Sequence, residues 1–372
     1  MPGTKKNRYK SRTYLGISLN GGVKMAKKEL LQKLGDMSQY AGFQHVEYRS
    51  GRGKGSEAFE AYNAGGLQFS VMPDKCMDIF QLIYKGVNIG YISKNGLVAG
   101  SRYDSSDDGF LKYWSAGMLS TCGLDNVGPA CVDQGVHHGI HGRLSMLPAE
   151  NICTNAQWID DDYELRFSGE MRQSMLDGMN LRLKRQISTG LYDKEIVIQD
   201  TLENLEPVPE EFMILYHFNF GYPLLDNGAR IVKPKGKITP RDDEAKKGIS
   251  DCLSIQNPRA GKAEQVYFHE NKTDENGMAY VGLINDKLKL GAYLKYRADT
   301  LPVLVQWKSY RPHDYALGLE PSNSYIMGRG LERENGTLKS IDPYETLRYK
   351  VVLGILDGED MIRDFEDITS RL

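Results

Sequence analysis

Cysteine is scarce in this sequence and follows no pattern. The 372 residues include five cysteines, an odd number, and no two of them form a CxxC pair. They are Cys76, Cys122, Cys131, Cys153 and Cys252. A disulfide framework or a zinc ribbon needs paired, closely spaced cysteines, so both are excluded and reduced thiols in the cytoplasm are predicted.

Long hydrophobic runs are also absent. No stretch approaches the roughly 18 apolar residues that a membrane-spanning helix requires. The segment "YLGISL" follows five basic residues between Lys5 and Arg12, but it is too short and too polar for a secretory signal. We therefore expect a cytoplasmic protein without a membrane partner.

An excess of one charge sign is the third absence. Lys and Arg total 47 against 49 Asp and Glu, which gives a formal net charge of -2. Nucleic acids and anionic membranes select strongly basic surfaces, so neither is an expected partner. The partner should be a small or neutral molecule, and the sequence leaves the oligomeric state open.

The first 40 residues differ from the rest of the chain. A basic arm is predicted up to about residue 20, and "VKMAKKELLQKL" from Val23 has the apolar spacing of an amphipathic helix. The glycine-rich "RSGRGKGSEAF" further on lacks the GK[ST] ending of a phosphate loop and is predicted to be a plain loop. No break in composition divides residues 41–372, so a single domain is expected there.

From about residue 56 the chain consists of β-rich segments separated by turns. Four of them, from "DYELRFSGE" to "EEFMILYHFNF", follow one another at short intervals and predict an antiparallel meander, since parallel pairing needs crossover helices. Similar segments recur up to "TLRYKVVLGIL". The pattern predicts an all-β protein built as a large antiparallel sandwich of two sheets.

The segment "LYHFNFGYPLLDNG", from Leu215 to Gly228, is the most informative strand. Side chains alternate between the two faces of a strand, so His217 and Asn219 share one face with Met213 and Leu215. Both faces are otherwise apolar, which is typical of a strand covered on each side. The polar pair is therefore either satisfied within the core or lines a cavity.

Glu320 in "YALGLEPSNS" is a second candidate. Its strand face also carries Ala316 and Gly318, whose small size leaves room beside the carboxylate. A carboxylate on an apolar strand needs a partner or a ligand. Glu320 is either a surface residue before Pro321 or a general base in a pocket.

Three of the seven histidines cluster in "GVHHGIHGR". His137 and His141 have the spacing of a helical metal site, but the glycines between and around them disfavour a helix. We expect a loop in which a histidine binds a ligand hydroxyl or has a structural role, and no metal or other cofactor. His45, His269 and His313 lie in polar segments and are expected to be exposed.

One histidine and one glutamate suit a particular reaction. Opening a sugar hemiacetal requires removing the proton of the anomeric hydroxyl while a proton is given to the ring oxygen. Groups with ordinary pKa values near 4.3 and 6.5 can do both at neutral pH. Rotation and reclosure then exchange the anomers, with no need for a nucleophile, metal or redox cofactor.

Five motifs in order resemble a known family. "TCGLDNVGP", "HGRLSMLPAE", "LYHFNFGYPLL", "VQWKSY" and "LGLEPSNS" are similar to the aldose 1-epimerase-like family of the galactose mutarotase-like fold, in the branch often given as a domain of unknown function. The resemblance runs from about Leu34 to Leu356. It implies a twisted antiparallel β-supersandwich, here with a short N-terminal helical extension, that binds sugar in a cleft.

The resemblance also implies roles for individual residues. His217 matches the general acid that acts on the ring oxygen, and Glu320 matches the general base at the C1 hydroxyl. His141 is similar to a histidine that holds sugar hydroxyls, and Asn219 is expected to orient His217 or the sugar. Asp78 lies in a segment whose usual sequence in this family is proline-aspartate-arginine-glycine.

This chain departs from the family in that segment. "PDKCMDI" has Lys75 where arginine is typical and Cys76 where glycine is typical. Lysine keeps the charge but lacks the bidentate fork of arginine, so recognition of substrate should differ. We expect Lys75 and Asp78 to contact substrate.

Two further cations are candidates for binding hydroxyls or an acidic substituent. They are Arg143, beside the histidine loop, and Lys308 in "VQWKSY", with a plain surface position as the alternative for each. Lys308 and Trp307 must point to opposite faces of one strand. We expect Lys308 to face the cleft together with Gln306, and Trp307 to face the core; the alternative is that Trp307 stacks on an apolar sugar face.

The leading hypothesis is thus a sugar mutarotase, an isomerase acting on a monosaccharide or a derivative. A non-catalytic carbohydrate-binding protein that uses the same cleft is the alternative. A metal-dependent sugar isomerase using His137, His138 and His141 is a third and weaker one. The identity of the sugar does not follow from the sequence.

Overall fold

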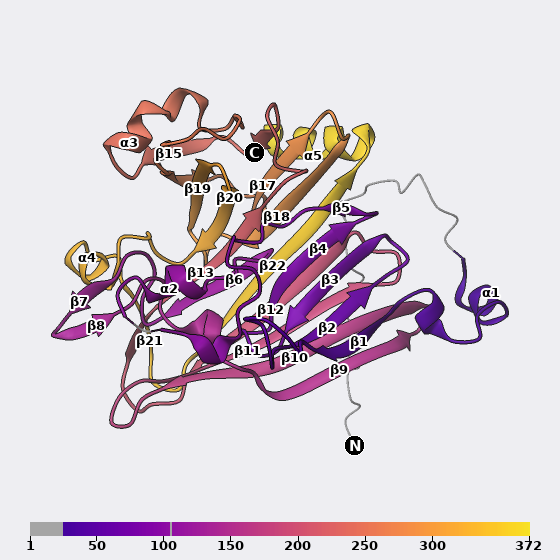
Figure 1. The fold of residues 1–372 in the computed structure, drawn as a ribbon, viewed down its shortest axis with the longest axis horizontal. Coiled ribbons are helices and arrows are strands. Elements are labelled where there is room, and N and C mark those ends of the chain that lie inside the picture. Colours follow the sequence, from indigo (N-terminus) through magenta and orange to yellow (C-terminus); the bar gives the residue numbers. More distant parts are fainter. Residues whose placement is uncertain (1–24, 105) are drawn as a thin grey trace, which may run out of the picture.

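The computed structural model describes residues 25–104 and 106–372, and the predicted basic arm lies outside them. Two large sheets pack against each other around one core, and every pairing between named strands is antiparallel (Figure 1). The predicted all-β class and antiparallel sandwich are confirmed.

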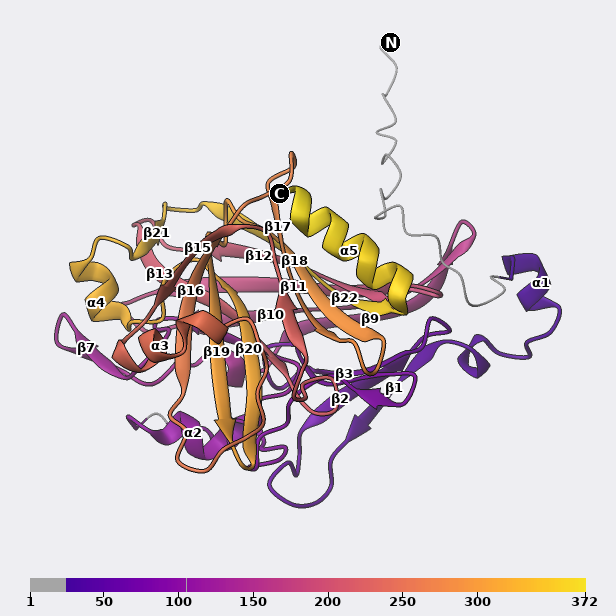
Figure 2. The ribbon, with the colours of Figure 1, turned by 90° about the horizontal axis from the view of Figure 1, so that it is seen from above.

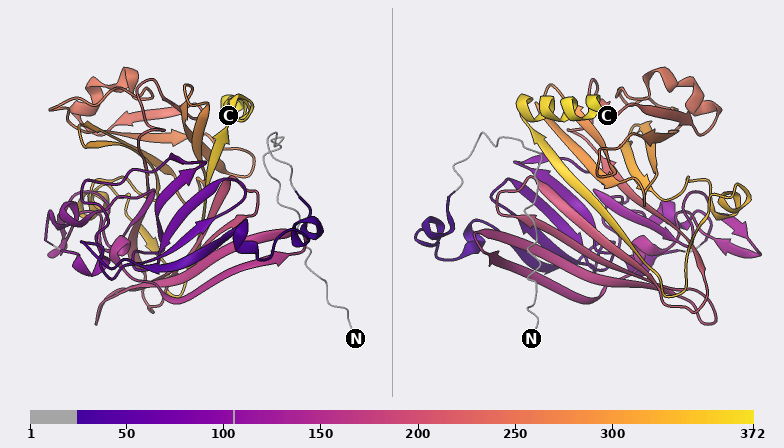
Figure 3. Two further views of the ribbon diagram at one scale, coloured as in Figure 1. Left: turned by 45° about the vertical axis from the view of Figure 1, so that its right-hand side comes forward. Right: turned by 180° about the vertical axis from the view of Figure 1, so that it is seen from behind.

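The larger sheet has eight strands and includes the last strand of the chain in its interior. Its order is β14 (Arg230–Val232), β17 (Met278–Asn285), β18 (Leu290–Arg297), β22 (Thr346–Asp357), β12 (Glu195–Asn204), β11 (Asn180–Gly190), β10 (Asp162–Ser174) and β9 (Glu150–Ile159). In the rear view of Figure 3 the long β22 crosses the middle of this sheet.

The second sheet carries the central strand of the sequence analysis. Its order is β15 (Gly236–Pro240), β16 (Gln265–Asn271), β19 (Val303–Arg311), β20 (Asp314–Ser322), β13 (Glu210–Phe220) and β21 (Lys339–Ile341), with β6 (Leu119–Leu124) also paired to β13. The prediction of a four-strand meander is right for β10, β11 and β12 but wrong for β13. This strand crosses to the other sheet, where both of its faces are covered.

A third sheet and a small hairpin complete the strands. The sheet contains β1 (Gly42–Glu47), β2 (Glu57–Tyr62), β3 (Leu67–Met72), β4 (Asp78–Tyr84) and β5 (Val87–Asn88), and the hairpin contains β7 (Cys131–Asp133) and β8 (Val136–His138). Lys85 and Gly86 form the tight turn between β4 and β5, both with positive φ, as a two-residue hairpin turn requires.

The helices are short, apart from the last one. They are α1 (Lys27–Leu31), α2 (Gly109–Tyr113), α3 (Asp243–Lys247), α4 (Arg329–Glu334) and α5 (Glu359–Arg371), with 3-10 turns η1 (Met37–Gln39), η2 (Gly100–Arg102), η3 (Leu144–Met146) and η4 (Ile249–Asp251). The predicted N-terminal helix shrinks to the five residues of α1, whose Leu30 joins the main core. The helix α5 was not expected from the sequence and lies along the eight-stranded sheet (Figure 2). Its Ile362 and Phe365 pack against residues of that sheet.

The two faces of β13 have different surroundings. Alternate residues from Phe212 to Phe220 enter the core between the large sheets. Met213 and Leu215, on the opposite face, join a separate apolar cluster with residues of β16 and β19. His217 lies on this second face, as the period of two predicted, and is therefore outside the main core.

Candidate active site

His217 and Glu320 meet across two neighbouring strands. In the register of β13 and β20, Phe218 pairs with Leu319, so His217 stands opposite Glu320. The Nδ1 atom of His217 lies 3.3 Å from Oε1 of Glu320, and both side chains are buried. Neither atom has a hydrogen-bond partner among the described residues, so both are available to a bound ligand or to a proton shared between them.

Gly318 makes room for the carboxylate. A Cβ atom built on this glycine would overlap Oε1 of Glu320, which folds back over the backbone at that point. The position does not require a positive φ, so steric space is the reason for glycine here. The expectation that small residues beside Glu320 leave space for its carboxylate is confirmed.

A cavity of about 590 Å³ opens in front of this pair. His141, His217 and Glu320 line it together with Trp114 and Trp307. The ring centroids of the two tryptophans lie 5.1 and 5.6 Å from that of His217. The structure thus brings together three of the residues selected from the sequence, and it surrounds them with aromatic rings.

His141 lies in the loop after β8 and presents one nitrogen to the cavity. Its Nδ1 accepts a hydrogen bond from the backbone N–H of Gly128 at 3.3 Å, which leaves the proton of the neutral ring on Nε2. The ring also packs on Phe110, with centroids 5.3 Å apart. Burial lowers the pKa of His141 to about 4, so this residue is a neutral hydrogen-bond donor at pH 7.

Burial sets the protonation of the central pair. It lowers the pKa of His217 well below its usual value, with the neighbouring His141 acting in the same direction. It raises the pKa of Glu320 well above its usual value, with help from the nearby Glu264. Both shifts favour the uncharged forms of the two groups, and in those forms the pair holds a single transferable proton, the number that one acid and one base share.

Trp307 and Lys308 occupy the faces opposite to those expected. Trp307 lines the cavity, whereas Lys308 is buried on the other face of β19, where Nζ donates to the carbonyls of Asp251 and Ser254 at 3.1 Å each. The alternation of faces was predicted correctly, but the choice of face was wrong. The segment around η4 covers the Lys308 face and supplies carbonyls for its ammonium group.

Asn219 supports the strand and does not line the cavity. Its Nδ2 donates to the backbone carbonyls of Gly117 and His217, at 3.0 and 2.9 Å. This side chain ties the His217 backbone to the segment that precedes β6. The structure therefore connects Asn219 with the placement of His217 and not with the cavity wall.

Asp78 belongs to a buried charge cluster between the sheets. Its carboxylate accepts from Nη1 of Arg185 at 2.7 Å and from the backbone and hydroxyl of Thr121 at 2.8 and 2.6 Å. Arg185 also pairs with Asp200, which accepts from the hydroxyl of Tyr216 at 2.8 Å. The expected contact of Asp78 with substrate is not supported, because Arg185 and Thr121 enclose it.

Lys75 and Arg143 also lie away from the cavity. Nζ of Lys75 is buried against the carbonyl of Val98 and the sulfur of Met146, at 3.1 and 3.4 Å, and burial lowers its pKa to about 8. Arg143 is partly exposed, with Nε 3.9 Å from Asp125. Neither residue is among those that line the cavity.

The other histidines are dispersed. His137 is exposed on the β7–β8 hairpin, and Nδ1 of His138 lies 3.9 Å from Asp125. In residues 25–104 and 106–372, no group of three or more His, Cys, Asp or Glu side chains has the arrangement of a metal site. His269 was expected to be exposed but is buried, because it pairs with Gln306 at 2.8 Å beneath the η4 segment.

Three charged cavity residues escaped the sequence analysis. Arg241 forms ion pairs with Asp242 at 2.9 Å and with Glu264 at 3.0 Å, and Glu264 also accepts from the indole N–H of Trp307 at 2.9 Å. All three lie just outside regular strands, where no period assigns a side chain to a face. No motif in these segments could have identified them.

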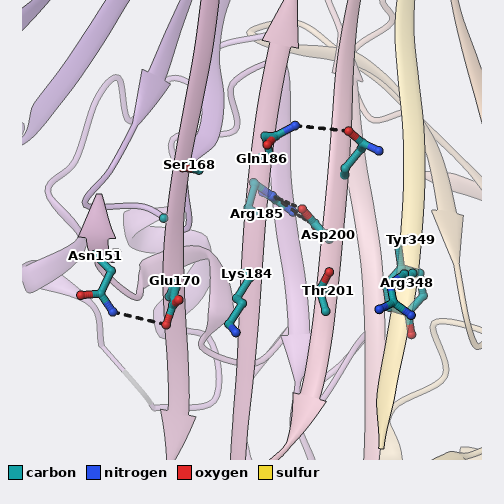
Figure 4. A pocket seen from close by; sticks show the side chains of 12 residues that line it. Asn151, Ser168, Glu170, Lys184, Arg185, Gln186, Asp200, Thr201, Arg348 and Tyr349 are labelled. Carbon is teal, nitrogen blue, oxygen red and sulfur yellow. Dashed lines mark hydrogen bonds and ion pairs between the residues drawn. The ribbon is translucent and has the colours of Figure 1, made fainter. Parts of the chain in front are cut away.

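A second hollow, of about 450 Å³, lies on the outer face of the eight-stranded sheet (Figure 4). Polar side chains there bond to one another, as Asn151 does to Glu170 at 3.4 Å and Gln186 to Gln199 at 3.3 Å. None of the residues expected to bind substrate lines it. The cavity at His217 is therefore the candidate active site.

Comparison with known proteins agrees with this fold. A family model described as a domain of unknown function, DUF4432, matches residues 53–355. The chain belongs to the DUF4432 family. This result confirms the resemblance inferred from the five motifs, and the match spans β4, β13 and β20. Comparison with curated protein sequences finds no match.

Solved structures place this DUF4432 chain in the galactose mutarotase-like fold. A candidate aldose 1-epimerase from Klebsiella pneumoniae subsp. pneumoniae MGH 78578 is similar with a TM-score of 0.85 and 23% identity, over 93% of this chain and 90% of that chain. A galactose mutarotase-like protein from Clostridium acetobutylicum is similar with a TM-score of 0.59 and 14% identity, over 86% of this chain and 99% of that chain. A galactose 1-epimerase from Lactobacillus acidophilus NCFM is similar with a TM-score of 0.55 and 13% identity, over 86% of this chain and 100% of that chain.

Proposed function

We propose that this protein is a sugar mutarotase that exchanges anomers by general acid and base catalysis. The observation that carries the proposal is the His217–Glu320 pair, which is buried in the wall of a cavity with Nδ1 and Oε1 3.3 Å apart. The fold that it shares with a galactose 1-epimerase supports the same reaction class. The substrate is a reducing monosaccharide or a derivative of one.

The single proton of the pair performs the first step. It passes from Glu320 to His217 over the short distance between them, which produces an imidazolium beside a carboxylate. His217 then gives a proton to the ring oxygen while Glu320 takes the proton of the C1 hydroxyl. Ring opening leaves both groups neutral, which is the state that burial favours.

Reclosure reverses these transfers. The C1–C2 bond of the open aldehyde rotates, so the C5 hydroxyl attacks the opposite face of the carbonyl. Glu320 returns its proton to the carbonyl oxygen, and His217 takes the proton of the attacking hydroxyl. The donor Nε2 of His141 would hold a sugar hydroxyl, and the flanking tryptophans would cover the apolar ring face.

The test measures anomer exchange by polarimetry and NMR on a panel of freshly dissolved aldoses. Glu320→Gln and His217→Ala should each reduce exchange at least 100-fold, because each leaves the proton transfer without one partner. Glu270→Gln and His313→Ala change the same residue types at exposed positions and should have no effect. Unchanged catalysis in both site variants would refute the assignment.

Sugar binding without exchange above the uncatalysed rate would instead favour the carbohydrate-binding alternative. We also propose a cytoplasmic location, which the five free cysteines support. No helix in the described part of the chain is long and apolar enough to cross a membrane.

A further inference from the structure

The two tryptophans of the cavity present carbon surface to a ligand. The indole N–H of Trp114 donates to the hydroxyl of Ser120 at 3.1 Å, and that of Trp307 donates to Glu264 at 2.9 Å. An indole has no other donor and no acceptor. Neither ring can therefore hydrogen-bond a sugar hydroxyl without losing a bond within the protein.

Two further acidic residues of the cavity wall, Asp242 and Glu264, also form bonds within the protein. Oδ1 of Asp242 accepts the backbone N–H of Ala245 at 2.9 Å, and Oδ2 accepts Nε of Arg241. One oxygen of Glu264 accepts from Arg241 and the other from Trp307. These carboxylates serve first to hold Arg241 and Trp307 in place.

Most of the remaining wall is hydrocarbon. It consists of the side chains of Phe110, Leu111, Ile140, Val266, Ile326 and Met327. Among the lining residues, Nδ1 of His217 and Oε1 of Glu320 are buried without a hydrogen-bond partner in the described part of the chain, and the ring of His141 lies 5.7 Å from that of His217. The buried polar atoms that lack a partner thus lie at the His217–Glu320 pair, and the hydrocarbon part of the wall offers no partners for hydroxyl groups.

We propose that the cavity selects a hydroxyl-poor reducing sugar, meaning a deoxy sugar or a sugar with a hydroxyl capped by a methyl or acyl group. This inference rests on the proposed function for the position of the anomeric centre at His217 and Glu320. A hydroxyl that faces hydrocarbon loses its water without gaining a bond, which costs binding energy. A methyl or methylene group at the same place gains contact with the wall instead.

The experiment compares sugars that differ at one hydroxyl. The pairs are D-galactose with D-fucose, D-glucose with 6-deoxy-D-glucose, D-glucose with 2-deoxy-D-glucose, and D-glucose with 3-O-methyl-D-glucose. In at least one pair, kcat/KM for anomer exchange should favour the hydroxyl-poor member by roughly 10- to 100-fold, the range that an apolar pocket achieves against an added hydroxyl. Equal or faster exchange of the hydroxyl-rich member in every pair would overturn the proposal.

Binding is measured separately by tryptophan fluorescence. Trp114 and Trp307 line the cavity, and the third tryptophan, Trp158, lies on β9 outside it. The Trp158→Phe variant therefore reports on the cavity alone. Tighter binding of the hydroxyl-poor sugars without any anomer exchange would refute the mutarotase function and support the proposed selectivity. Anomer exchange that favours the hydroxyl-rich sugars would support the mutarotase function and refute the proposed selectivity.

Two variants test the source of the selectivity. Met327→Gln preserves the length of the side chain and adds hydrogen-bonding groups to the cavity wall. Leu111→Asn adds hydrogen-bonding groups at a half-exposed site on α2. At least one should reduce the preference for the hydroxyl-poor sugar about tenfold. Met175→Gln, at an exposed hairpin tip, is the control. An unchanged preference in both cavity variants would show that the hydrocarbon wall does not select the sugar and would overturn the proposal.

Discussion

His217 and Glu320 are direct cross-strand neighbours on β13 and β20, with Nδ1 and Oε1 3.3 Å apart. The pair is held by the backbone register of two adjacent strands and does not depend on a flexible loop. Because β13 is covered on both faces, a slip of one residue would place Phe218 in the site and His217 in the core. The fold thus fixes the separation of the two groups.

The pH dependence of anomer exchange should follow this pair. Burial lowers the pKa of His217 and raises that of Glu320, so activity should have a plateau over which the pair holds one proton. Activity falls at low pH when His217 takes a second proton, and at high pH when Glu320 loses the last one. The measurement is kcat/KM against pH. A single transition near pH 6.5, as for an isolated histidine, would contradict the shared proton.

Gly318→Ala should reduce activity about 100-fold while the protein still folds. The added Cβ would overlap Oε1 of Glu320 and displace the carboxylate, and a displacement of about 1 Å can have an effect of this size. Kinetics and a thermal melt check the prediction together. Gly35→Ala, where the Cβ would meet nothing closer than Gln39 at 3.7 Å, serves as the control. Full activity in Gly318→Ala would show that the carboxylate position is unimportant.

Arg185→Met should destabilise the fold by about 3–5 kcal/mol, the usual effect of breaking a buried ion pair. The substitution leaves the carboxylates of Asp78 and Asp200 buried without their cation. Urea unfolding measures the loss. Arg172→Met, at an exposed position on β10, should change stability by less than about 0.5 kcal/mol. Equal stability of the two variants would mean that water reaches the cluster.

Lys308→Met tests whether Lys308 is a buried structural residue, as observed, or a substrate-binding residue in the cleft, as expected from the sequence. The substitution removes a donor from two buried carbonyls and should cost about 1–3 kcal/mol of stability. It should leave kcat/KM within about twofold of the parent value, because Lys308 does not line the cavity. Lys350→Met, at an exposed position on β22, is the control for folding. A large loss of catalysis in a well-folded variant would restore Lys308 to the site.

Lys308 should also affect how the free energy of unfolding depends on pH. Burial lowers the pKa of Lys308 to about 8, below its unfolded value of roughly 10.4. Between these values the unfolded chain binds more protons than the folded one, so this group makes the folded state more stable as pH rises. Unfolding free energies measured from pH 8 to 10 should lose this contribution in Lys308→Met.

Period-two reasoning predicted the features that depend on strands. It placed His217 on the face of β13 away from the aromatic residues, and it placed Glu320 beside the small Gly318. It also separated Trp307 from Lys308. It could not decide which face of β19 meets the cavity, because that depends on the η4 segment, more than 50 residues away in sequence.

Residues in segments without strand alternation could not be assigned to the site from the sequence. Arg241 and Glu264 enter the cavity from segments without regular alternation, and their ion pair forms only in the folded chain. Asp78 follows a family pattern, but its partner Arg185 lies 107 residues away. A sequence offers no sign that these two charges neutralise each other within the core.

The position of β22 has a consequence for synthesis of the chain. This strand is made after all the others, yet it lies between β18 and β12 in the middle of the eight-stranded sheet. A chain that stops before Thr346 therefore has two uncovered strand edges, which readily pair with other chains. His217 and Glu320 are already present in such a fragment. Truncation ahead of β22 should thus yield aggregates that contain both proposed catalytic residues and show no anomer exchange.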